Sequence, residues 1–162
     1  MTEPAAPVTP ARVVEAMADF GLVTTPRRNR VRIVVSRDRI RDGLLRVQGQ
    51  LACDHVVHIA AVDNGSTFEL HYSLTGPHRL IVTLAVAVPR DDARVVSVHD
   101  LLPPAGIYER QIHDLFGIVF EGHPNLKRLI LTEDWPEGEY PLRKDWKMDP
   151  NRSYGGAVTE AK

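Results

Sequence analysis

The middle of the chain constrains the fold most, because apolar and polar residues alternate there. In the stretch TFELHYSL, residues 67–74, apolar side chains occupy positions 68, 70, 72 and 74, and polar side chains occupy positions 69, 71 and 73. A period of two places the first set on one face of a β-strand and the second set on the other. The pattern therefore predicts a half-buried strand of an antiparallel sheet.

Two further strands are predicted beside it. Residues 55–63, HVVHIAAVD, end at the turn tripeptide NGS, and residues 80–89, LIVTLAVAVP, follow the turn sequence TGPHR. Apolar runs bounded by such turn residues are typical of strands joined in a meander. With two helices predicted before the meander, the pattern indicates an α+β fold.

The first of these helices has a recognisable start. Thr9 is a candidate N-cap, and Pro10 would occupy the first helical position. Apolar residues at helical spacing continue to Phe20, and Gly21 is predicted to close the helix.

Three more elements are predicted from composition and spacing. Residues 31–36 form a short β-branched strand, and residues 38–51 carry apolar side chains at helical spacing. A third helix is predicted from about Ile107 to Phe116, with Gly117 as the residue that follows its end.

The composition excludes several classes of protein. With 43% hydrophobic and 25% charged residues the chain is globular, and a net charge of -1 gives no general attraction to nucleic acid or acidic membranes. The single cysteine, Cys53, excludes an internal disulfide and an iron–sulfur cluster held by this chain alone, and fits a reducing cytoplasmic setting. No apolar run approaches the ~20 residues of a membrane-spanning helix, and the first ten residues do not resemble a signal peptide.

Two clusters of polar residues have the composition of binding sites. Cys53, His55 and His58 have the short spacing of metal ligands, but strand alternation would place the two histidines on opposite sides. Four arginines between Arg27 and Arg32 could bind phosphate, a lipid headgroup or nucleic acid. Ordinary histidines and a solvated turn are the favoured interpretations.

Residues 109–145 hold the remaining candidate chemistry. On a helix, Glu109 and His113 would form one i,i+4 pair, and Arg110 and Asp114 another, each contributing about 0.3–0.5 kcal/mol at the surface. A stand-alone enzyme could use His113 with Asp114 or Glu109, or His123, as acid and base. No nucleophile or metal ligand accompanies them, and no nucleotide-binding or hydrolase motif occurs.

A third interpretation is a surface that docks another protein. The segment after Gly122 contains aromatic residues and arginines, which are enriched at the centres of interfaces. Four prolines between 124 and 150 would hold it extended and reduce the entropy lost on docking. The residues concerned are Trp135, Tyr140, Trp146, Arg128 and Arg143.

The same region resembles the signature of the thirty-kilodalton subunit family of respiratory complex I, which is the family of the C subunit of NADH–quinone oxidoreductase. The family pattern is E-R-E-x-x-D-[ML]-[FL]-G-I, then G-H-P-x-L-x-R-[IL]-L, then P-L-R-K-D; the resemblance covers roughly residues 9–148. The matching residues are Glu109, Arg110, Asp114, Leu115, Phe116, Gly117, Ile118, Gly122, His123, Pro124, Leu126, Arg128, Leu129, Pro141, Leu142, Arg143, Lys144 and Asp145.

The resemblance implies an α+β fold: a small antiparallel or mixed sheet with helices packed on one face, plus an extended C-terminal docking segment. It implies no redox centre, cofactor or metal in this chain. The expected partners are the subunit that resembles the hydrogenase large subunit, hereafter the large subunit, and a small iron–sulfur subunit. Iron–sulfur clusters, and a nickel–iron centre or quinone, would belong to those partners. The chain would lie on the cytoplasmic face of the membrane and contact the membrane only through them.

The branch of the family is less constrained. Gln111 replaces a usual Glu, His113 replaces a frequent Trp or Tyr, and LTEDWPEGEYPLRKD resembles the hydrogenase-type versions. These departures favour slightly an energy-converting (group 4) hydrogenase or formate hydrogenlyase-type complex; the alternative is the C subunit of a proton-pumping NADH–quinone oxidoreductase.

The expected organisation follows. Residues 1–8 form a flexible leader, 9–120 the α+β domain, 121–148 the docking segment and 149–162 a tail. Charged contacts within the chain or to the partner are expected from Glu109, Arg110, Asp114, Arg128, Arg143 and Asp145. Buried area at the interface is expected from Phe116, Trp135 and Tyr140.

Overall fold

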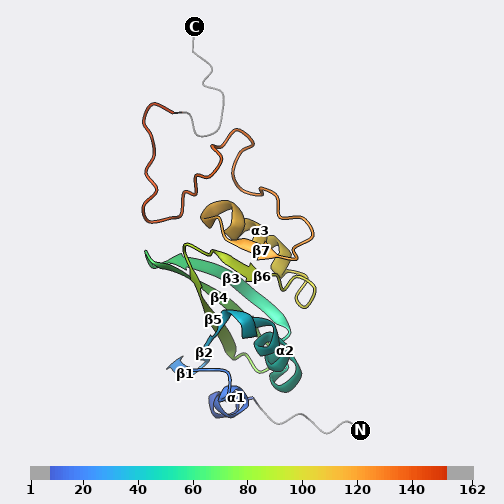
Figure 1. Cartoon of the computed structure of the whole chain (residues 1–162). Helices are drawn as coiled ribbons and strands as arrows, with labels where there is room; N and C mark the ends of the chain where they lie inside the picture. Colours follow the sequence, from blue (N-terminus) through green and yellow to red (C-terminus); the bar gives the residue numbers. More distant parts are fainter. Residues whose placement is uncertain (1–7, 153–162) are drawn as a thin grey trace.

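The computed structural model describes residues 8–152 and confirms the predicted α+β class (Figure 1). The predicted leader lies almost wholly, and the end of the predicted tail wholly, outside the described residues. The elements in chain order are α1 (Pro10–Met17), β1 (Val23–Arg27), β2 (Arg30–Val35), a 3-10 turn (Arg37–Arg39), α2 (Ile40–Leu51), β3 (His55–Asp63), β4 (Thr67–Thr75), β5 (Ile81–Pro89), β6 (Arg94–Val96), α3 (Ala105–Phe116) and β7 (Val119–Glu121).

The main sheet has five strands in the order β1-β2-β5-β4-β3. The predicted meander of β3, β4 and β5 is antiparallel throughout, whereas β2 pairs with β5 in parallel. The sheet is therefore mixed. Strand β1 was not predicted, because its sequence VTTPR contains a proline and only Val23 is partly buried.

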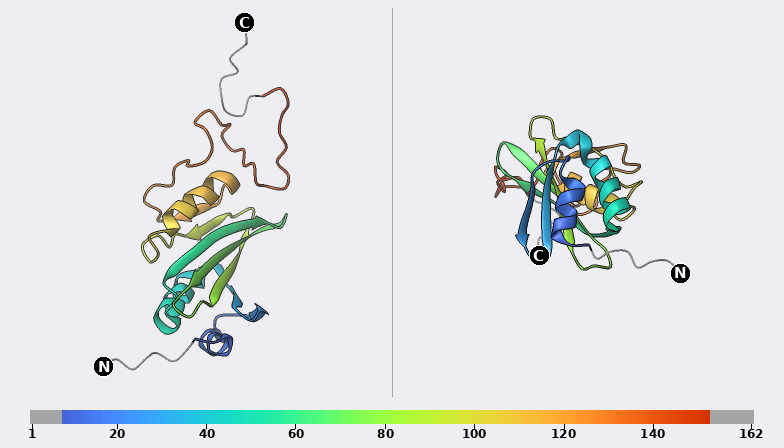
Figure 2. Two further views of the ribbon diagram at one scale, coloured as in Figure 1. Left: turned by 180° about the vertical axis from the view of Figure 1, so that it is seen from behind. Right: turned by 90° about the horizontal axis from the view of Figure 1, so that it is seen from below.

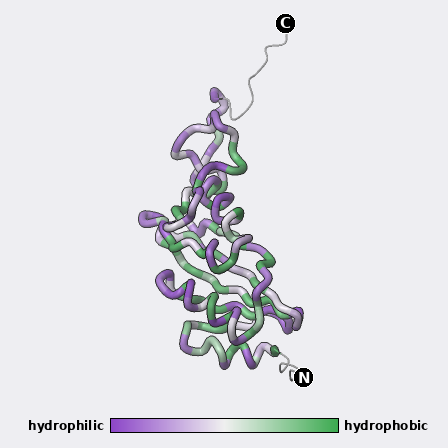
Figure 3. The backbone as a smooth tube through the Cα atoms, turned by 90° about the vertical axis from the view of Figure 1, so that its right-hand side faces the viewer, coloured by the Kyte–Doolittle hydropathy of each residue, from purple (hydrophilic) through white to green (hydrophobic). Residues whose placement is uncertain are grey.

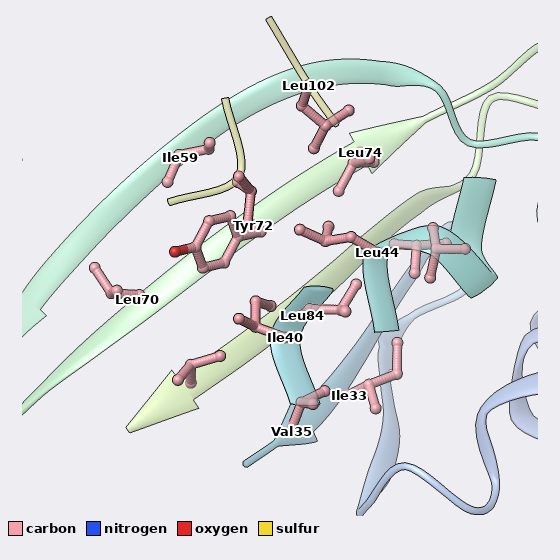
Figure 4. Close-up of a cluster of buried hydrophobic side chains, with 14 of the residues drawn as sticks. Ile33, Val35, Ile40, Leu44, Ile59, Leu70, Tyr72, Leu74, Leu84 and Leu102 are labelled. Carbon is pink, nitrogen blue, oxygen red and sulfur yellow. The ribbon is translucent and has the colours of Figure 1, made fainter. Parts of the chain in front are cut away.

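One face of this sheet carries the core. The side chains predicted to point inward from β4 are all buried. Tyr72, Leu74 and Leu84 lie in one apolar cluster with side chains from β2 and α2 (Figure 4). Helix α2 approaches closely at Gly43, where a Cβ atom would lie 2.8 Å from the Leu84 side chain. Helix α3 packs on the same face through Phe116, whose ring meets Phe68 edge-on at 6.0 Å. The helices thus share one face, as predicted.

The glycine after α1 has a different role from the one predicted. Thr9 caps the helix as expected, because its hydroxyl accepts a hydrogen bond from the Arg12 N–H at 3.3 Å. The helix already ends at Met17, however, and Gly21 lies against strand β2. A Cβ atom there would be 1.9 Å from the carbonyl oxygen of Val34, so only glycine allows this approach.

A β-bulge in β3 corrects the expectation for the two histidines. The register shifts between Val56 and His58, so that one extra residue enters the strand. His55 pairs with Thr75 and His58 with Ser73, and both histidines are exposed on the outer face. They therefore share one side of the strand, because the bulge breaks the alternation.

The molecule is elongated, with α1 at one end and the C-terminal segment at the other (Figures 1 and 2). Between them, β6 and β7 form a two-stranded parallel sheet beside α3. Residues 122–152, hereafter the C-terminal segment, contain neither helix nor strand. The segment is mostly hydrophilic, with one short apolar stretch at residues 129–131 (Figure 3).

Candidate functional site

Glu109 lies inside the protein, where α3 meets the strand-end loop after β6. Its side chain is fully buried, and its carboxylate accepts hydrogen bonds from the Ser97 hydroxyl at 2.5 Å and the Val98 N–H at 2.8 Å. Burial raises the pKa of Glu109, and these two hydrogen bonds only partly offset that effect. The first residue of the signature thus fixes α3 to the loop that precedes it.

Two histidines surround this carboxylate. His123 Nε2 lies 3.0 Å from the Gly106 carbonyl oxygen and 4.0 Å from Glu109, and its Nδ1 accepts the Asn125 N–H at 3.0 Å. These contacts assign the neutral tautomer with the proton on Nε2. His99 Nδ1 lies 3.0 Å from the Ser97 hydroxyl oxygen. His123 therefore joins α3 to the start of the C-terminal segment, and both of its ring nitrogens are used in doing so.

Asp114 organises the backbone of the C-terminal segment. One carboxylate oxygen accepts the N–H groups of Leu129, Ile130 and Leu131 at 3.0, 2.8 and 2.8 Å. Burial alone would raise the pKa of Asp114, but the three N–H donors outweigh it and the pKa is lowered. A single ionised side chain thereby satisfies three backbone donors that have no secondary structure to pair with.

The arginines of the signature hold carbonyl groups of the same segment. Arg110 donates to the carbonyl oxygens of Lys127 at 3.1 Å and Arg128 at 2.8 Å. Arg128 in turn donates to those of Thr132 at 3.1 Å and Trp135 at 2.8 Å. The arginines thus pair carbonyl groups of this irregular backbone, and Asp114 pairs its N–H groups.

The two i,i+4 ion pairs expected on α3 do not form. Glu109 faces the protein interior and Asp114 is occupied by backbone N–H groups, so neither carboxylate faces the solvent beside its expected partner. His113 instead donates from Nδ1 to the Ile118 carbonyl oxygen at 2.9 Å. The expectation was wrong because tertiary contacts with the C-terminal segment replaced contacts along the helix.

The end of α3 receives the PLRKDW stretch. Gly117 has a φ of 73°, and a Cβ atom there would lie 2.4 Å from the Tyr140 ring. Arg143 donates to the Phe116 carbonyl oxygen at 2.7 Å, and its guanidinium lies 4.4 Å from the centre of the Tyr140 ring. Glycine is required both by the left-handed backbone and by the ring that covers it.

The far side of PLRKDW is attached to the sheet through residues that the sequence did not single out. Asp63, at the end of β3, is nearly fully buried and accepts the Lys144 N–H at 2.9 Å and an Arg90 N–H at 3.0 Å. Arg90 also donates a hydrogen bond to the Asp145 carboxylate. Burial works against ionisation of Asp63, but its hydrogen bonds and Arg90 lower its pKa overall. Asp63 precedes the tripeptide NGS, so it resembles an ordinary turn residue.

The two tryptophans close the segment on itself. Their rings stack with centres 5.9 Å apart, and the Trp135 indole N–H donates to the Glu139 carbonyl oxygen at 3.0 Å. The Trp146 indole N–H lies 3.2 Å from the Glu139 carboxylate. These rings are partly buried within the segment itself.

The structure thus gathers most of the predicted residues in one network between α3 and the C-terminal segment. Phe116 is buried against Phe68 and has little surface left for a partner. Gly122 and Pro124 lie exposed at the start of the segment, and Lys144 contributes through its backbone N–H. The described residues contain no group of His, Cys, Asp and Glu side chains arranged to hold a metal ion.

Several large apolar side chains of the C-terminal segment are exposed among its polar ones. Nine large hydrophobic side chains are exposed among the described residues, and four of them lie in the C-terminal segment. Leu129 is 38% exposed, Ile130 55%, Leu142 52% and Met148 65%. Leu129 and Ile130 are neighbours in the sequence, and adjoining exposed apolar side chains are a feature of interaction sites.

Residues 33–152 match the family model described as "Respiratory-chain NADH dehydrogenase, 30 Kd subunit". The chain belongs to this family. The match covers most of the chain, from the second half of β2 through β5, the signature helix and the whole C-terminal segment.

Relatives of this family member come from several respiratory systems. The chain is 33% identical over 142 residues to the C subunit of the F(420)H(2) dehydrogenase of Methanosarcina mazei, with 86% of this chain and 87% of that one covered. It is 34% identical over 107 residues to the C subunit of the NADH-quinone oxidoreductase of Chloroherpeton thalassium. That match covers 64% of this chain but only 44% of the other, so the chain spans less than half of that relative.

Two solved structures share its fold. A chain of the membrane-bound sulfane sulfur reductase, an archaeal respiratory membrane complex, superposes with a TM-score of 0.74 at 30% identity, with 84% of each chain covered. A trypsin-resistant fragment of Nqo5 superposes with a TM-score of 0.62 at 27% identity, covering 70% of this chain and 96% of the fragment. Within residues 8–152, no helix combines the length and apolar composition needed to cross a bilayer.

Proposed function

We propose that this family member is a non-catalytic assembly subunit, whose C-terminal segment docks the hydrogenase-type large subunit of a membrane-associated oxidoreductase. The proposal rests on a contrast within the segment between its buried polar anchors and its exposed apolar side chains. Its backbone is held by buried Asp114 and Asp63, while Leu129, Ile130 and Leu142 point their apolar surface outward. A surface held in place before binding loses less entropy on association.

The polar groups of the signature support a structural role. Asp114, Arg110 and His123 use their hydrogen bonds on backbone groups of this chain. An acid–base catalyst needs a titrating group that reaches a substrate, and hydrogen bonding lowers the basicity of Asp114. In this proposal the iron–sulfur clusters, and a nickel–iron centre or quinone, belong to the partner subunits, including a small iron–sulfur subunit.

The finer proposal is an energy-converting, hydrogenase-type complex, which the signature LTEDWPEGEYPLRKD favours. The chain also matches compact relatives along their length: 87% of the Methanosarcina subunit and 84% of the sulfane sulfur reductase chain. The second candidate is the C subunit of an NADH–quinone oxidoreductase, favoured by curated relatives of that name. Nickel in the purified native complex would support the first; NADH–quinone activity without nickel would support the second.

The docking proposal is tested by placing charge on the exposed apolar surface. Ile130→Asp combined with Leu142→Asp is expected to abolish co-purification with the large subunit, because a desolvated carboxylate cannot be accommodated in an apolar contact. The matched control is Leu22→Asp with Leu45→Asp, which are 68% and 50% exposed elsewhere on the molecule.

Co-purification from cells is compared between the two double variants, with near-identical circular dichroism as the check on folding. Loss with the first variant and retention with the control supports docking through the segment. Retention of the large subunit by Ile130→Asp/Leu142→Asp would contradict the proposal.

A further inference from the structure

The sheet has a second, uncovered face. All three helices pack on the inner face with Phe68 and Leu84, so the outer face has no layer above it among the described residues. A groove of about 310 Å³ runs over it. Its lining comes from each strand of the sheet: Pro26 of β1, Arg32 of β2, Thr83 of β5, His71 of β4 and His58 of β3.

The dimensions of this groove suit an extended polypeptide. Crossing five strands at a spacing of about 4.8 Å gives a path of roughly 19 Å, the length of about six extended residues. Small side chains form the floor, where the Ser73 and Thr83 hydroxyls lie 2.8 Å apart, and Ala60 lies beside them. Arginines stand on the β2 side of the floor and histidines on the other side.

One end of the groove is strongly basic. Of the sixteen arginines in the sequence, all within the described residues, twelve donate a hydrogen bond or form an ion pair through their side chains. The side chains of the other four form neither with any described residue, and all four are exposed: Arg27, Arg28, Arg30 and Arg79. The first three form the β1–β2 turn, and Arg79 lies in the β4–β5 turn.

The two turns are neighbours in space. Ile81, just after Arg79, donates its N–H to the Asn29 carbonyl oxygen at 3.0 Å, and Arg30 pairs with Ile81 in the parallel ladder. The four arginines therefore gather at one end of the sheet, hereafter the basic end. Few carboxylates face them: Glu69 is already shared by Arg32 and His71, each at 2.8 Å. Asp54 lies exposed at the start of β3.

We propose that the basic end and the groove of the outer sheet face dock an extended acidic segment of a second polypeptide. Carboxylates would pair with the four arginines, and the chain would lie along the groove. A flat membrane surface would reach the turns but would not follow the groove across the sheet face. Single-stranded nucleic acid binds through stacking on aromatic side chains, and the groove lining has no Phe, Tyr or Trp; its aromatic rings are the imidazoles of His58 and His71.

This surface is separate from the C-terminal segment, which lies at the opposite end of the molecule (Figures 1 and 2). The subunit would thereby bridge two neighbours. Failure of either docking proposal leaves the other standing, because different residues carry them.

Photo-cross-linking in the purified native complex tests the occupant. A photoreactive phenylalanine analogue replaces Asn29, which is exposed in the basic turn, or Gln50, which is exposed on α2 as the control. Position 29 is expected to cross-link to an Asp/Glu-rich peptide of another chain, identified by mass spectrometry, and position 50 is not. Adducts at position 29 with lipid or nucleic acid only, with a neutral or basic peptide, or no adduct at all, overturn the proposal.

Charge reversal then tests the arginines. Arg28→Glu/Arg30→Glu is expected to weaken the cross-linked neighbour's binding about tenfold or more at low salt, since two attractive charges become repulsive. The control Arg12→Glu/Arg94→Glu changes the net charge equally at exposed ion pairs elsewhere and is expected to change binding less than about twofold. Salt titration of subunit dissociation measures both. Equal weakening by the two double variants would contradict the inference.

Discussion

The sheet-and-helix body and the C-terminal segment are both ordered, but different forces hold them. In the body, strands and helices satisfy the backbone, and side chains such as Leu70 and Leu84 are removed from water. In the segment no helix or strand does this, and Asp114, Asp63 and Arg110 pair its backbone groups instead. The body therefore depends on apolar packing, and the segment on the ionisation of a few buried side chains.

This difference matters for assembly. A loop held by its own polar anchors keeps its outward apolar side chains in place without burying them. The same irregular stretch folded by apolar collapse would have hidden Ile130 and Leu142. Polar anchoring is thus a physical route by which a protein holds apolar side chains at its surface while remaining folded, as the docking proposal requires.

The largest effect is expected where the two regions meet. Phe68 packs against Phe116 and lies 5.4 Å from the Arg143 guanidinium, so Phe68→Ala removes core volume and a support of the segment. A loss of about 3–5 kcal/mol in the free energy of unfolding is expected. Denaturant titration measures it; a loss below about 1 kcal/mol would show that the two regions do not share a core.

A smaller and local effect is expected from Asp114→Asn. The amide keeps the shape but loses the charge that accepts three N–H groups, which costs about 1.5–3 kcal/mol. Hydrogen exchange is expected to accelerate at residues 129–131 and to stay unchanged at β4. Uniform acceleration across both regions would remove the distinction between them.

Gly117→Ala is expected to cost about 1–2 kcal/mol, because alanine is strained at a φ of 73° and its Cβ would displace the Tyr140 ring. Gly49→Ala is the control, since a Cβ there meets nothing within 4 Å. Thermal unfolding compares the two variants, and binding of the large subunit is expected to weaken only for Gly117→Ala.

Mild acidification is expected to have the smallest effect, and the two regions are expected to respond to pH in different ranges. The pKa of Glu109 is raised by burial, so the folded body takes up protons more readily than the unfolded chain and gains stability as pH falls toward the unfolded pKa. The pKa values of Asp114 and Asp63 are lowered, so their contribution persists above the unfolded pKa and is lost only as pH falls through the folded values.

Between pH 7 and pH 5 the segment should therefore stay attached while the body becomes slightly more stable. Below the ordinary aspartate pKa of about 4, as pH falls through the lowered pKa values of Asp114 and Asp63, the segment should detach first. Hydrogen exchange of residues 129–131 against β4 across this range follows both. Detachment of the segment already at pH 6 would show that its anchors do not titrate as proposed.

Much of the body was predictable because its signals are local. The alternation in 67–74 placed Phe68 and Tyr72 in the core, and Thr9 identified the start of α1. The bulge in β3 was not predictable, since an extra residue in a strand changes no composition pattern. Strands β1, β6 and β7 were missed because three to five residues are too few to show a period.

The sequence predicted which residues belong to the candidate site but not how they contact one another. The signature residues from Glu109 to Asp145 were recognised from their order along the chain, and most of them meet in one network. Their partners were not recognised: Asp63 and Arg90 contact residues 144 and 145, far away in sequence. Helical spacing suggested ion pairs between side chains along α3. In the folded protein two of these side chains instead bond backbone groups of the C-terminal segment.

The sequence by itself determined which apolar side chains of β4 are buried, where α1 begins and which family the chain resembles, because periodicity, capping and motif order are local properties. Tertiary structure alone decided that Glu109 and Asp114 are internal anchors, that four unpaired arginines among the described residues meet at one end of the sheet, and that Ile130 and Leu142 remain exposed. These outcomes depend on which distant segments come into contact. The physical reason is that the role of a charged or apolar side chain depends on its neighbours in the folded protein. They determine whether it is paired, buried or exposed to a partner.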